Sequence, residues 1–504
     1  MHHADAPPAL LTDLYQVTMA YAAWQAGRAE SRASFSLYYR SAPFGGGYTV
    51  ACGLEACRAF LANWAVTRDE CDYLRSLTTA DGGPLFSPDF LDWLGALRLK
   101  VDVDMVPEGR VVFPNEPLIR VTGPLAQAML IETTLENLTG FPTLVATKAA
   151  RICGAAEGDD VIEMGLRRSQ GPDGGVTASR AAYVGGCAAT SNLVAGERYG
   201  IPVRGTHAHA WVMAYDRELD AFDAFARAHP RNSILLVDTY DTLDGVRNAI
   251  TVAERMRARG DRLLGIRLDS GDLAYLSTEA RRLLDAAGFP DVQIVASNDL
   301  DEHLIDSLKR QGARIDVWGI GTKLVTAADS PSLGVVYKLT AIEDAAGEWA
   351  PRIKVSEQAS KTTTPGVLQV RRYRVNGEFA GDMLYDETAP PVGVGAMMVD
   401  PTDLTRRKRF AADAEFEELL RPALRAGALV GPLTSAREAL DAARARCASD
   451  LASFHAGVKR LVNPHQYPVG LERRLYDRRT ALVLAARKLE SPEPPPAGWD
   501  VAAD

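Results

Sequence analysis

The residues best suited to chemistry stand where apolar runs of the sequence end, between Val161 and Lys323. They comprise arginines, a histidine pair, aspartates, serines and a glycine loop: Arg167, Arg168, His207, His209, Asp238, Asp241, Asp269, Ser270, Asp272, Ser297 and the stretch from Gly319 to Thr322. Cations and backbone N–H groups bind phosphate, and aspartates suit a divalent cation. The set therefore predicts a site for a polyphosphate substrate, a metal ion and a second anionic ligand.

The elements that must position these residues are βα repeats. Six apolar runs end near Gly165, Gly205, Asp238, Asp269, Asn298 and Gly321, and the segments between them place apolar residues at helical spacing. Runs that are apolar throughout are typical of strands covered on both faces, which indicates a parallel sheet. Its carboxyl ends carry the binding loops. The sequence predicts an α/β fold whose core is an open, incomplete α/β barrel.

Two aspartates, Asp238 in SILLVDTYDT and Asp269 in RLDSGD, end consecutive runs. A buried strand followed by a capping aspartate explains either motif alone. Their repetition predicts that they orient Mg²⁺ and the hydroxyls of a ribose, since both need hard oxygen ligands. Arg267, Ser270 and Gly271 of the same motif fit an anion and sugar site.

A glycine loop follows the last run, with Gly319, Gly321 and Thr322 in WGIGTK. It is too short for a P-loop, which disfavours a kinase of that class. Its position predicts a phosphate site on backbone N–H groups at a helix start.

The GTHAHAW motif places His207 and His209 two residues apart, which would put them on the same side of an extended chain. Imidazole serves as base, metal ligand or nucleophile. Without a third ligand nearby, metal binding is the weaker interpretation. In EMGLRRSQGPDGG, an arginine fork is suited to a planar carboxylate, with a plain surface loop as the alternative.

The remaining chain predicts a β-rich α+β domain built from both ends. We expect an N-terminal domain over 1–125, the barrel over 126–335, a C-terminal segment over 336–490 that completes the β-rich domain and adds helices, and a disordered tail over 491–504. Asn376-Gly377 between alternating segments predicts a hairpin. The stretch from Gln127 is expected to form one helix and TLVATKAARICGAA a second.

The totals exclude several classes. A net charge of -9 argues against nucleic acid as a partner, and no apolar stretch is long enough to span a membrane. The N-terminus lacks a signal-peptide pattern, so we expect a cytoplasmic protein. Six scattered cysteines without a C-x-x-C pattern predict free thiols, with no disulfide framework or structural zinc.

The ordered motifs TDLYQVTMAY, PFGGGYTVACGLE, FPNEPLIRVTGP, EMGLRRSQGPDGG, GTHAHAW, RLDSGDL, WGIGTKLVT and NPHQYPVGL closely resemble the nicotinate phosphoribosyltransferase family over nearly the whole chain. The resemblance implies an enzyme of NAD biosynthesis that joins nicotinate to 5-phosphoribosyl 1-diphosphate, giving nicotinate mononucleotide and diphosphate. It also implies coupled ATP hydrolysis, Mg²⁺ and a homodimer with active sites shared between subunits.

Carried over by motif, the resemblance implies roles for individual residues. ATP would phosphorylate His209, and Arg167 would hold the pyridine carboxylate. Tyr15 would stack on the ring from the partner subunit. Asp238 and Asp269 lie near Mg²⁺ and the ribose in this picture, Arg267 near phosphate, and residues 319–322 around the 5-phosphate.

Met164 departs from the family pattern, in which phenylalanine is common, and we expect weaker ring affinity with the chemistry intact. The alternatives are a nicotinamide-preferring enzyme and a non-catalytic relative that binds pyridine or phosphoribosyl groups. Ser191 and Asn192 stand where an amide-binding acid is expected, which favours nicotinate. Intact His209, Asp238 and Asp269 argue against the non-catalytic relative. A Schiff-base aldolase is disfavoured because no lysine ends a core strand.

Overall fold

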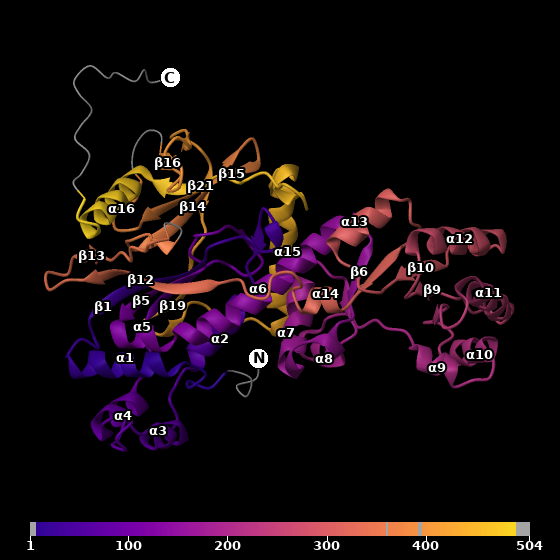
Figure 1. Ribbon diagram of the computed structural model, residues 1–504, viewed down its shortest axis with the longest axis horizontal. Helices are drawn as coiled ribbons and strands as arrows, with labels where there is room; N and C mark the ends of the chain where they lie inside the picture. The colour runs from indigo at the N-terminus through magenta and orange to yellow at the C-terminus, as the bar shows by residue number, and fades with distance from the viewer. Residues whose placement is uncertain (1–6, 359–360, 392–395, 490–504) are drawn as a thin grey trace.

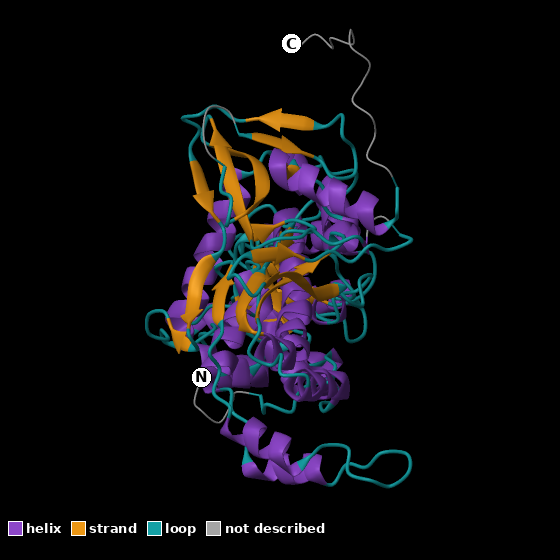
Figure 2. Ribbon diagram, turned by 90° about the vertical axis from the view of Figure 1, so that its left-hand side faces the viewer, coloured by secondary structure: helices purple, strands orange, loops and turns teal. Residues whose placement is uncertain are grey.

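The computed structural model describes residues 7–358, 361–391 and 396–489. Figure 1 shows an elongated molecule with strands from both chain termini at one end and a parallel sheet with its helices at the other. The long helix α6 (Glu132–Ala155) runs between the two parts. Seen from the end that carries α1, the strands form an upper and a lower group (Figure 2). The fold is thus mixed α/β, as the sequence predicts.

The parallel sheet has the strand order β7-β6-β11-β10-β9-β8, and each neighbouring pair is parallel. Its strands are β6 (Asp160–Glu163), β7 (Ala189–Thr190), β8 (Ile234–Leu236), β9 (Gly265–Leu268), β10 (Gln293–Ala296) and β11 (Val317–Ile320). Five of the six predicted runs form these strands. Their continuous apolar sequence is explained by the helices that cover the sheet.

The run that ends at Gly205 does not form a strand, so that prediction was wrong. Its place in the sheet is taken by β7, and Val203 makes one isolated parallel bridge to Thr190. Pro202 accepts a hydrogen bond from Thr190 through its carbonyl but has no N–H to donate. A ladder therefore cannot continue through this segment.

Helices pack around the sheet and connect its strands. They are α7 (Gly171–Val184), α8 (Leu193–Tyr199), α9 (His209–Met213), α10 (Glu218–Ala228), α11 (Thr242–Ala258), α12 (Leu273–Ala286), α13 (Glu302–Arg310) and α14 (Thr322–Val325). Figure 1 shows α9 to α12 on the outer side of this part of the molecule. The short 3₁₀ segment η3 (Leu166–Arg168) follows β6.

The segment before β6 forms α5 (Leu125–Leu130) and then one continuous α6, not two helices separated before residue 143. The sequence-based division was wrong because Pro142 lies inside α6. A proline frees the carbonyl four residues earlier, here that of Leu138. Gly53 (φ +91°) lies against this carbonyl, and a Cβ at Gly53 would be 1.9 Å from it. Close packing by a glycine thus accommodates the interrupted helix.

A seven-stranded antiparallel sheet combines both chain ends in the order β13-β12-β1-β5-β3-β19-β20. Its strands are β1 (Arg32–Tyr39), β3 (Asp102–Met105), β5 (Ile119–Pro124), β12 (Val335–Glu343), β13 (Trp349–Pro351), β19 (Arg421–Arg425) and β20 (Ala428–Leu429). Pairing of β12 with β1 and of β19 with β3 confirms that the chain returns to its N-terminal part. Helices α1 (Leu14–Gln25), α2 (Leu54–Asn63), α3 (Arg68–Arg75) and α4 (Pro88–Ala96), with the pair β2 (Thr49–Val50) and β4 (Val111–Val112), complete this region.

The later strands form a second sheet that contains only C-terminal segments, with the order β17-β16-β21-β15-β14-β18. They are β14 (Leu368–Val375), β15 (Glu378–Asp386), β16 (Met397–Val399), β17 (Arg407–Arg409), β18 (Phe416–Glu418) and β21 (Val469–Glu472), accompanied by α15 (Ala436–Ser453) and α16 (Arg473–Ala486). Asn376 and Gly377 form the β14–β15 turn with positive φ, which confirms the predicted hairpin. This separate sheet was not expected from the sequence.

All six cysteines are free, and all but Cys153 are buried, in agreement with the sequence prediction. Within the described residues, no helix is long and apolar enough to cross a membrane. The predicted tail over 491–504 lies outside the described residues.

Candidate active site

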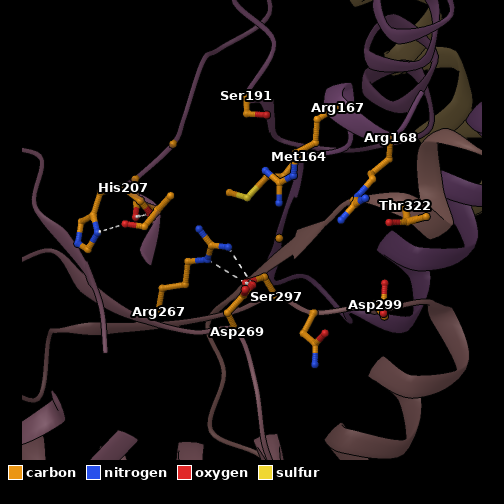
Figure 3. A pocket seen from close by; sticks show the side chains of 16 residues that line it. Met164, Arg167, Arg168, Ser191, His207, Arg267, Asp269, Ser297, Asp299 and Thr322 are labelled. Carbon is orange, nitrogen blue, oxygen red and sulfur yellow. Dashed lines mark hydrogen bonds and ion pairs between the residues drawn. The ribbon is translucent and has the colours of Figure 1, made fainter. Parts of the chain in front are cut away.

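A cavity of about 340 Å³ lies at the carboxyl ends of the parallel strands (Figure 3). Residues at or after the ends of β6, β7, β9, β10 and β11 line it: Met164, Arg167, Arg168, Ser191, Gly205, Thr206, His207, Ala208, Arg267, Asp269, Ser297, Asn298, Asp299, Gly319, Gly321 and Thr322. In Figure 3, the arginines that follow β6 lie on one side and Arg267 and Asp269 on the other. The parallel sheet therefore gathers loops that are far apart in the sequence.

Arg267, Asp269 and Ser297 form a hydrogen-bonded cluster on one wall. The Arg267 guanidinium donates to Asp269 Oδ1 at 2.8 Å and to Ser297 Oγ at 2.8 Å, and the Ser297 hydroxyl also bonds Asp269. Burial alone would raise the pKa of Asp269, but the hydrogen bond from Ser297 and the Arg267 charge outweigh burial and lower the pKa. Asp269 is thus ionised at neutral pH, and an arginine balances its charge.

Asp238 lies behind this wall and supports it. Its Oδ2 accepts the Asp269 backbone N–H at 3.0 Å and the Ser270 hydroxyl at 2.5 Å. Its Oδ1 is buried and has no hydrogen-bond partner among the described residues. An unsatisfied carboxylate oxygen beside Asp269 fits a Mg²⁺ ion, which prefers one or two carboxylates together with substrate phosphates.

In the described part of the chain, no group of three His, Cys, Asp or Glu side chains is arranged to hold a metal ion. A metal bound by Asp238 and Asp269 would therefore need further oxygen ligands from a substrate or water. This requirement fits a metal that arrives with a diphosphate.

The two histidines differ in environment. His207 is 8% exposed, and its Nε2 accepts the Leu236 backbone N–H at 3.2 Å. Burial, together with Arg267 and His209, lowers its pKa, so the ring is neutral. The Phe225 ring packs against the His207 ring in an edge-to-face arrangement, with 4.7 Å between the ring centroids. Although His207 borders the cavity, its acceptor nitrogen is used in the fold.

His209 is the first residue of α9, and its ring faces Asp269. Its Nδ1 is 3.2 Å from Thr239 Oγ1, and its Nε2 is 3.7 Å from Asp269 Oδ2. The imidazole is 39% exposed. This ring is therefore oriented by a hydroxyl, faces a carboxylate and is open to a reactant, which is the arrangement that a nucleophile needs.

Arg167 and Arg168 lie in the 3₁₀ segment after β6, and both are exposed. Neither guanidinium has an ion-pair or hydrogen-bond partner among the described residues. Two unpaired guanidinium groups on a cavity wall favour an anionic ligand.

Met164 precedes this segment, and its backbone N–H donates to Ile320 O at 2.7 Å. A Cβ at Gly319 would come within 3.0 Å of Met164 Sδ. The glycine loop and Met164 are therefore packed closely together. Thr322 begins α14, with Gly321 as the residue before the helix.

Several predicted residues lie outside the cavity. His209 and Asp238 contact Asp269, which lines the cavity, and Ser270 bonds Asp238. Asp241 and Asp272 cap α11 and α12 through their carboxylates. Gly271 has φ +80°, a conformation that favours glycine, and lies in the turn between β9 and α12. Tyr15 is 47% exposed on α1, and Figure 1 shows α1 in the part of the molecule away from β9 and β10.

Sequence reasoning missed the buried Glu163, which organises the loops on one side of the cavity. Its carboxylate accepts hydrogen bonds from Gly165 N, from Ser179 Oγ at 2.8 Å and from Thr190 Oγ1 at 2.6 Å. Glu163 is fully buried. A glutamate inside the apolar run DVIEMG was the available signal, since a buried carboxylate needs donors.

The chain matches three family models along its length. Residues 10–139 match the nicotinate phosphoribosyltransferase N-terminal domain, residues 161–383 the nicotinate phosphoribosyltransferase family, and residues 369–479 the nicotinate phosphoribosyltransferase C-terminal domain.

Curated relatives and a solved structure carry the same name. The chain is 48% identical over 385 residues to the nicotinate phosphoribosyltransferase of Bacillus subtilis (strain 168), which covers 75% of this chain and 76% of that relative. It is 39% identical over 535 residues to nicotinate phosphoribosyltransferase 2 of Arabidopsis thaliana, with 93% of each chain covered. The crystal structure of human nicotinic acid phosphoribosyltransferase matches with a TM-score of 0.80 and 34% identity, covering 94% of this chain and 100% of that one.

Proposed function

The chain belongs to the nicotinate phosphoribosyltransferase family, and we propose on this premise how its residues carry out the reaction of that family. The enzyme joins nicotinate to 5-phosphoribosyl 1-diphosphate and gives nicotinate mononucleotide and diphosphate, a step of NAD biosynthesis. The observation that carries the assignment of residues is the cavity, where unpaired arginines, the Arg267–Asp269 pair and a glycine loop meet.

Arg167 binds the nicotinate carboxylate, because its guanidinium is exposed on the cavity wall and is not neutralised by an acid of the described chain. Met164 packs on the pyridine ring through its polarisable sulfur. Ser191, at the cavity wall, supplies no carboxylate for an amide NH₂ group. Asn192 is occupied as the N-cap of α8, where its side chain accepts the Ala195 backbone N–H. These features favour nicotinate over nicotinamide.

The phosphoribosyl group lies against the opposite wall. Backbone N–H groups at Gly319, Gly321 and Thr322 face the 5-phosphate, and Arg267 contacts a phosphate group of the substrate. Asp269, with Ser270 and Gly271, holds the ribose hydroxyls. Asp238 and Asp269 would hold Mg²⁺, which would supply positive charge to neutralise the departing diphosphate.

The reaction forms a bond between the pyridine nitrogen and ribose C1 while the bond from C1 to diphosphate oxygen breaks. Because the pyridine nitrogen carries its own lone pair, this chain's residues chiefly position the two substrates. The Asp269 carboxylate steadies positive charge that develops on the ribose ring in the transition state.

ATP coupling proceeds through His209 in this proposal. The imidazole attacks the γ-phosphorus of ATP, ADP leaves, and water later cleaves the P–N bond to give inorganic phosphate. The exposed ring, held by Thr239 and facing Asp269, supports this role. A phosphate on His209 places added negative charge next to the aspartates, which changes how the diphosphate site binds its ligands.

We further propose a homodimer with shared sites, because α1, which carries the exposed Tyr15, lies beside the antiparallel sheet, whereas the cavity lies at the parallel sheet (Figure 1). A second copy would supply Tyr15. In this proposal the open parallel sheet is an incomplete α/β barrel over 126–335, joined to a domain over 1–125 and a segment over 336–490, and the enzyme works in the cytoplasm.

The test measures product from 5-phosphoribosyl 1-diphosphate and Mg²⁺ with nicotinate or nicotinamide, each with and without ATP. Nicotinate should be the substrate, and ATP should raise turnover. Arg167→Met should lower kcat/KM for nicotinate roughly 100-fold, as expected for a lost charge-assisted pair, and Arg168→Met should have a smaller effect. His209→Ala should turn over at the ATP-independent rate of the wild type. Turnover of nicotinamide alone, or full ATP stimulation in His209→Ala, would contradict the corresponding assignment.

A further inference from the structure

A second cavity, of about 530 Å³, lies in the C-terminal sheet and shares no lining residue with the first. The β14–β15 turn, β17 and the segment after α15 form its walls, with Val375, Asn376, Glu378, Phe379, Ala380, Lys408, His455, Val458, His465, Tyr467 and Pro468. Three of these residues, His465, Tyr467 and Pro468, belong to the motif NPHQYPVGL, for which the proposed reaction provides no role. The cavity is within the size range of small-molecule pockets, roughly 300–1000 Å³.

Lys408 is the charged group of this cavity that most needs a counter-ion. Its side chain is half-buried, and Nζ donates to the Ala380 carbonyl at 2.5 Å. No carboxylate lies within ion-pair distance of it among the described residues. Burial lowers the pKa of Lys408, and no acidic neighbour opposes that shift. An ammonium on a cavity wall without a carboxylate partner is stabilised by a bound anion.

Two histidines add hydrogen-bond donors to the same cavity. His455 Nδ1 accepts the Gly457 backbone N–H at 3.1 Å, which leaves the Nε2–H as a donor. The His465 ring lies with its centroid 6.4 Å from that of His455. Both rings are exposed, so neither is confined to the protein interior. The amide of Asn376 adds another donor from the hairpin turn.

The lining carries one lysine and one acid, so anion binding depends on where the two charges lie and not on their sum. Glu378 is exposed at the cavity and opposes anion binding through its own charge. Arg374, next to the cavity, places its guanidinium 3.9 Å from the centroid of the Phe379 ring and is ion-paired with Glu417, so it adds no free charge to the lining. Apolar atoms of Phe379, Val458 and Pro468 provide the remaining wall.

We propose that this cavity binds a phosphorylated small molecule, with the phosphate on Lys408, His455 and His465 and the organic part against the apolar wall. Donors from three separate segments suit an anion with several oxygens, which a phosphate offers and a single carboxylate does not. This site is independent of the proposed transferase reaction, because it uses none of the residues of the first cavity.

The experiment is a titration of the full-length protein with inorganic phosphate at constant ionic strength, observed by NMR of ¹³C-labelled histidine side chains. The resonances of His455 and His465, assigned with His455→Gln and His465→Gln, should shift and saturate. Phosphate in the first cavity would instead shift the resonances of His207 and His209, so the two sites are read separately. Lys408→Met should weaken binding about tenfold or more, as expected for loss of a charge-assisted contact.

Matched variants test the assignment. Lys459→Met removes a nearby lysine whose Nζ is bonded to Leu451 O and which does not line the cavity, so binding should change less than about threefold. Glu378→Gln should tighten binding, which keeps the proposal testable if Lys408→Met does not fold. The proposal is overturned if the histidine shifts do not saturate with phosphate, or if sodium chloride produces the same shifts. It is also overturned if acetate binds as tightly as phosphate, or if Lys408→Met binds phosphate as tightly as the wild type does.

Discussion

Glu163→Gln is the substitution that tests most directly how the fold positions the proposed nicotinate side of the cavity. The Glu163 carboxylate is buried at the end of β6 and receives hydrogen bonds from Gly165, Ser179 and Thr190. Gly165 follows Met164, and Thr190 precedes Ser191. One carboxylate thus holds both loops that border the proposed pyridine site.

The expected magnitude follows from the chemistry of the donors. Glutamine keeps one acceptor oxygen, and its NH₂ group must face some of the former donors. The hydroxyls of Ser179 and Thr190 can turn to accept, but the Gly165 backbone N–H cannot. Loss of a hydrogen bond to a charged acceptor costs about 1.5–3 kcal/mol. If this cost appears in the placement of the Arg167 loop, kcat/KM for nicotinate falls about 10- to 100-fold.

The assay measures KM separately for nicotinate and for 5-phosphoribosyl 1-diphosphate, with thermal unfolding alongside. Glu163→Gln should raise KM for nicotinate while leaving KM for the other substrate within about threefold, since the donors to the Glu163 carboxylate are Gly165, Ser179 and Thr190 and none belongs to the glycine loop. Ser179→Ala is the matched control, because it removes one donor and leaves the Gly165 bond in place; its effect on nicotinate should be smaller. A lower unfolding temperature with unchanged KM for nicotinate would refute a positioning role and leave a purely structural one.

Two further predictions concern pH and packing. Burial, assisted by the negative charge of Glu132, raises the pKa of Glu136 to about 7. Between pH values of about 4.5 and 7, the folded protein therefore keeps a proton on Glu136 that the unfolded chain releases. Because of this difference, the free energy of unfolding should fall as pH rises through that range. Glu136→Gln should flatten that fall and stabilise the protein by about 1 kcal/mol at pH 8 after allowance for partial exposure, which thermal unfolding between pH 5 and 8 would measure. Gly319→Ala should push Met164 aside and raise KM for nicotinate about threefold to tenfold. In a Met164→Ala background the same change should have little further effect, because the side chain that it displaces is absent. Gly321→Ala, whose Cβ would meet the nearest atom at 3.5 Å, should leave Met164 in place.

The parallel sheet was predictable because burial on both faces imposes an apolar sequence on each strand. The run at Pro202 misled the prediction, since its composition resembles the others while its missing N–H prevents a ladder. The two residues of β7 were missed because so short a strand leaves no periodicity to read. Composition therefore located the sheet, and hydrogen-bonding capacity decided which segments joined it.

The continuous α6 and the separate C-terminal sheet could not be read locally. A proline usually ends or kinks a helix. Pro142 lies inside α6, where Gly53, nearly 90 residues earlier in the sequence, packs closely against the carbonyl that the proline leaves free. The alternating strands of the C-terminal half were recognised, but alternation does not specify a partner strand. Only long-range pairing places β12 on β1 and β14 in a different sheet.

For the candidate site, the sequence indicated which strand ends carry chemistry, and the parallel topology explains why Asp238, Asp269 and Arg267 meet. It did not indicate the supporting hydroxyls. Ser297 was noted at a strand end, but its bond to Arg267 depends on the side-by-side pairing of β9 and β10. Residues that act through another residue carry no local signal of their own.

The two histidines of GTHAHAW illustrate why spacing alone could not assign roles. Spacing of two would direct both rings to one side if the chain were extended, but α9 begins at His209 and turns the backbone there. His207 then enters the space beside Phe225 and bonds the Leu236 N–H of β8, while His209 is directed to Thr239 and Asp269. Because the buried ring uses its lone pair within the fold, phosphorylation there would break a backbone contact. A phosphoryl group on His209 breaks no backbone bond, and the Arg267 charge beside Asp269 partly offsets its repulsion.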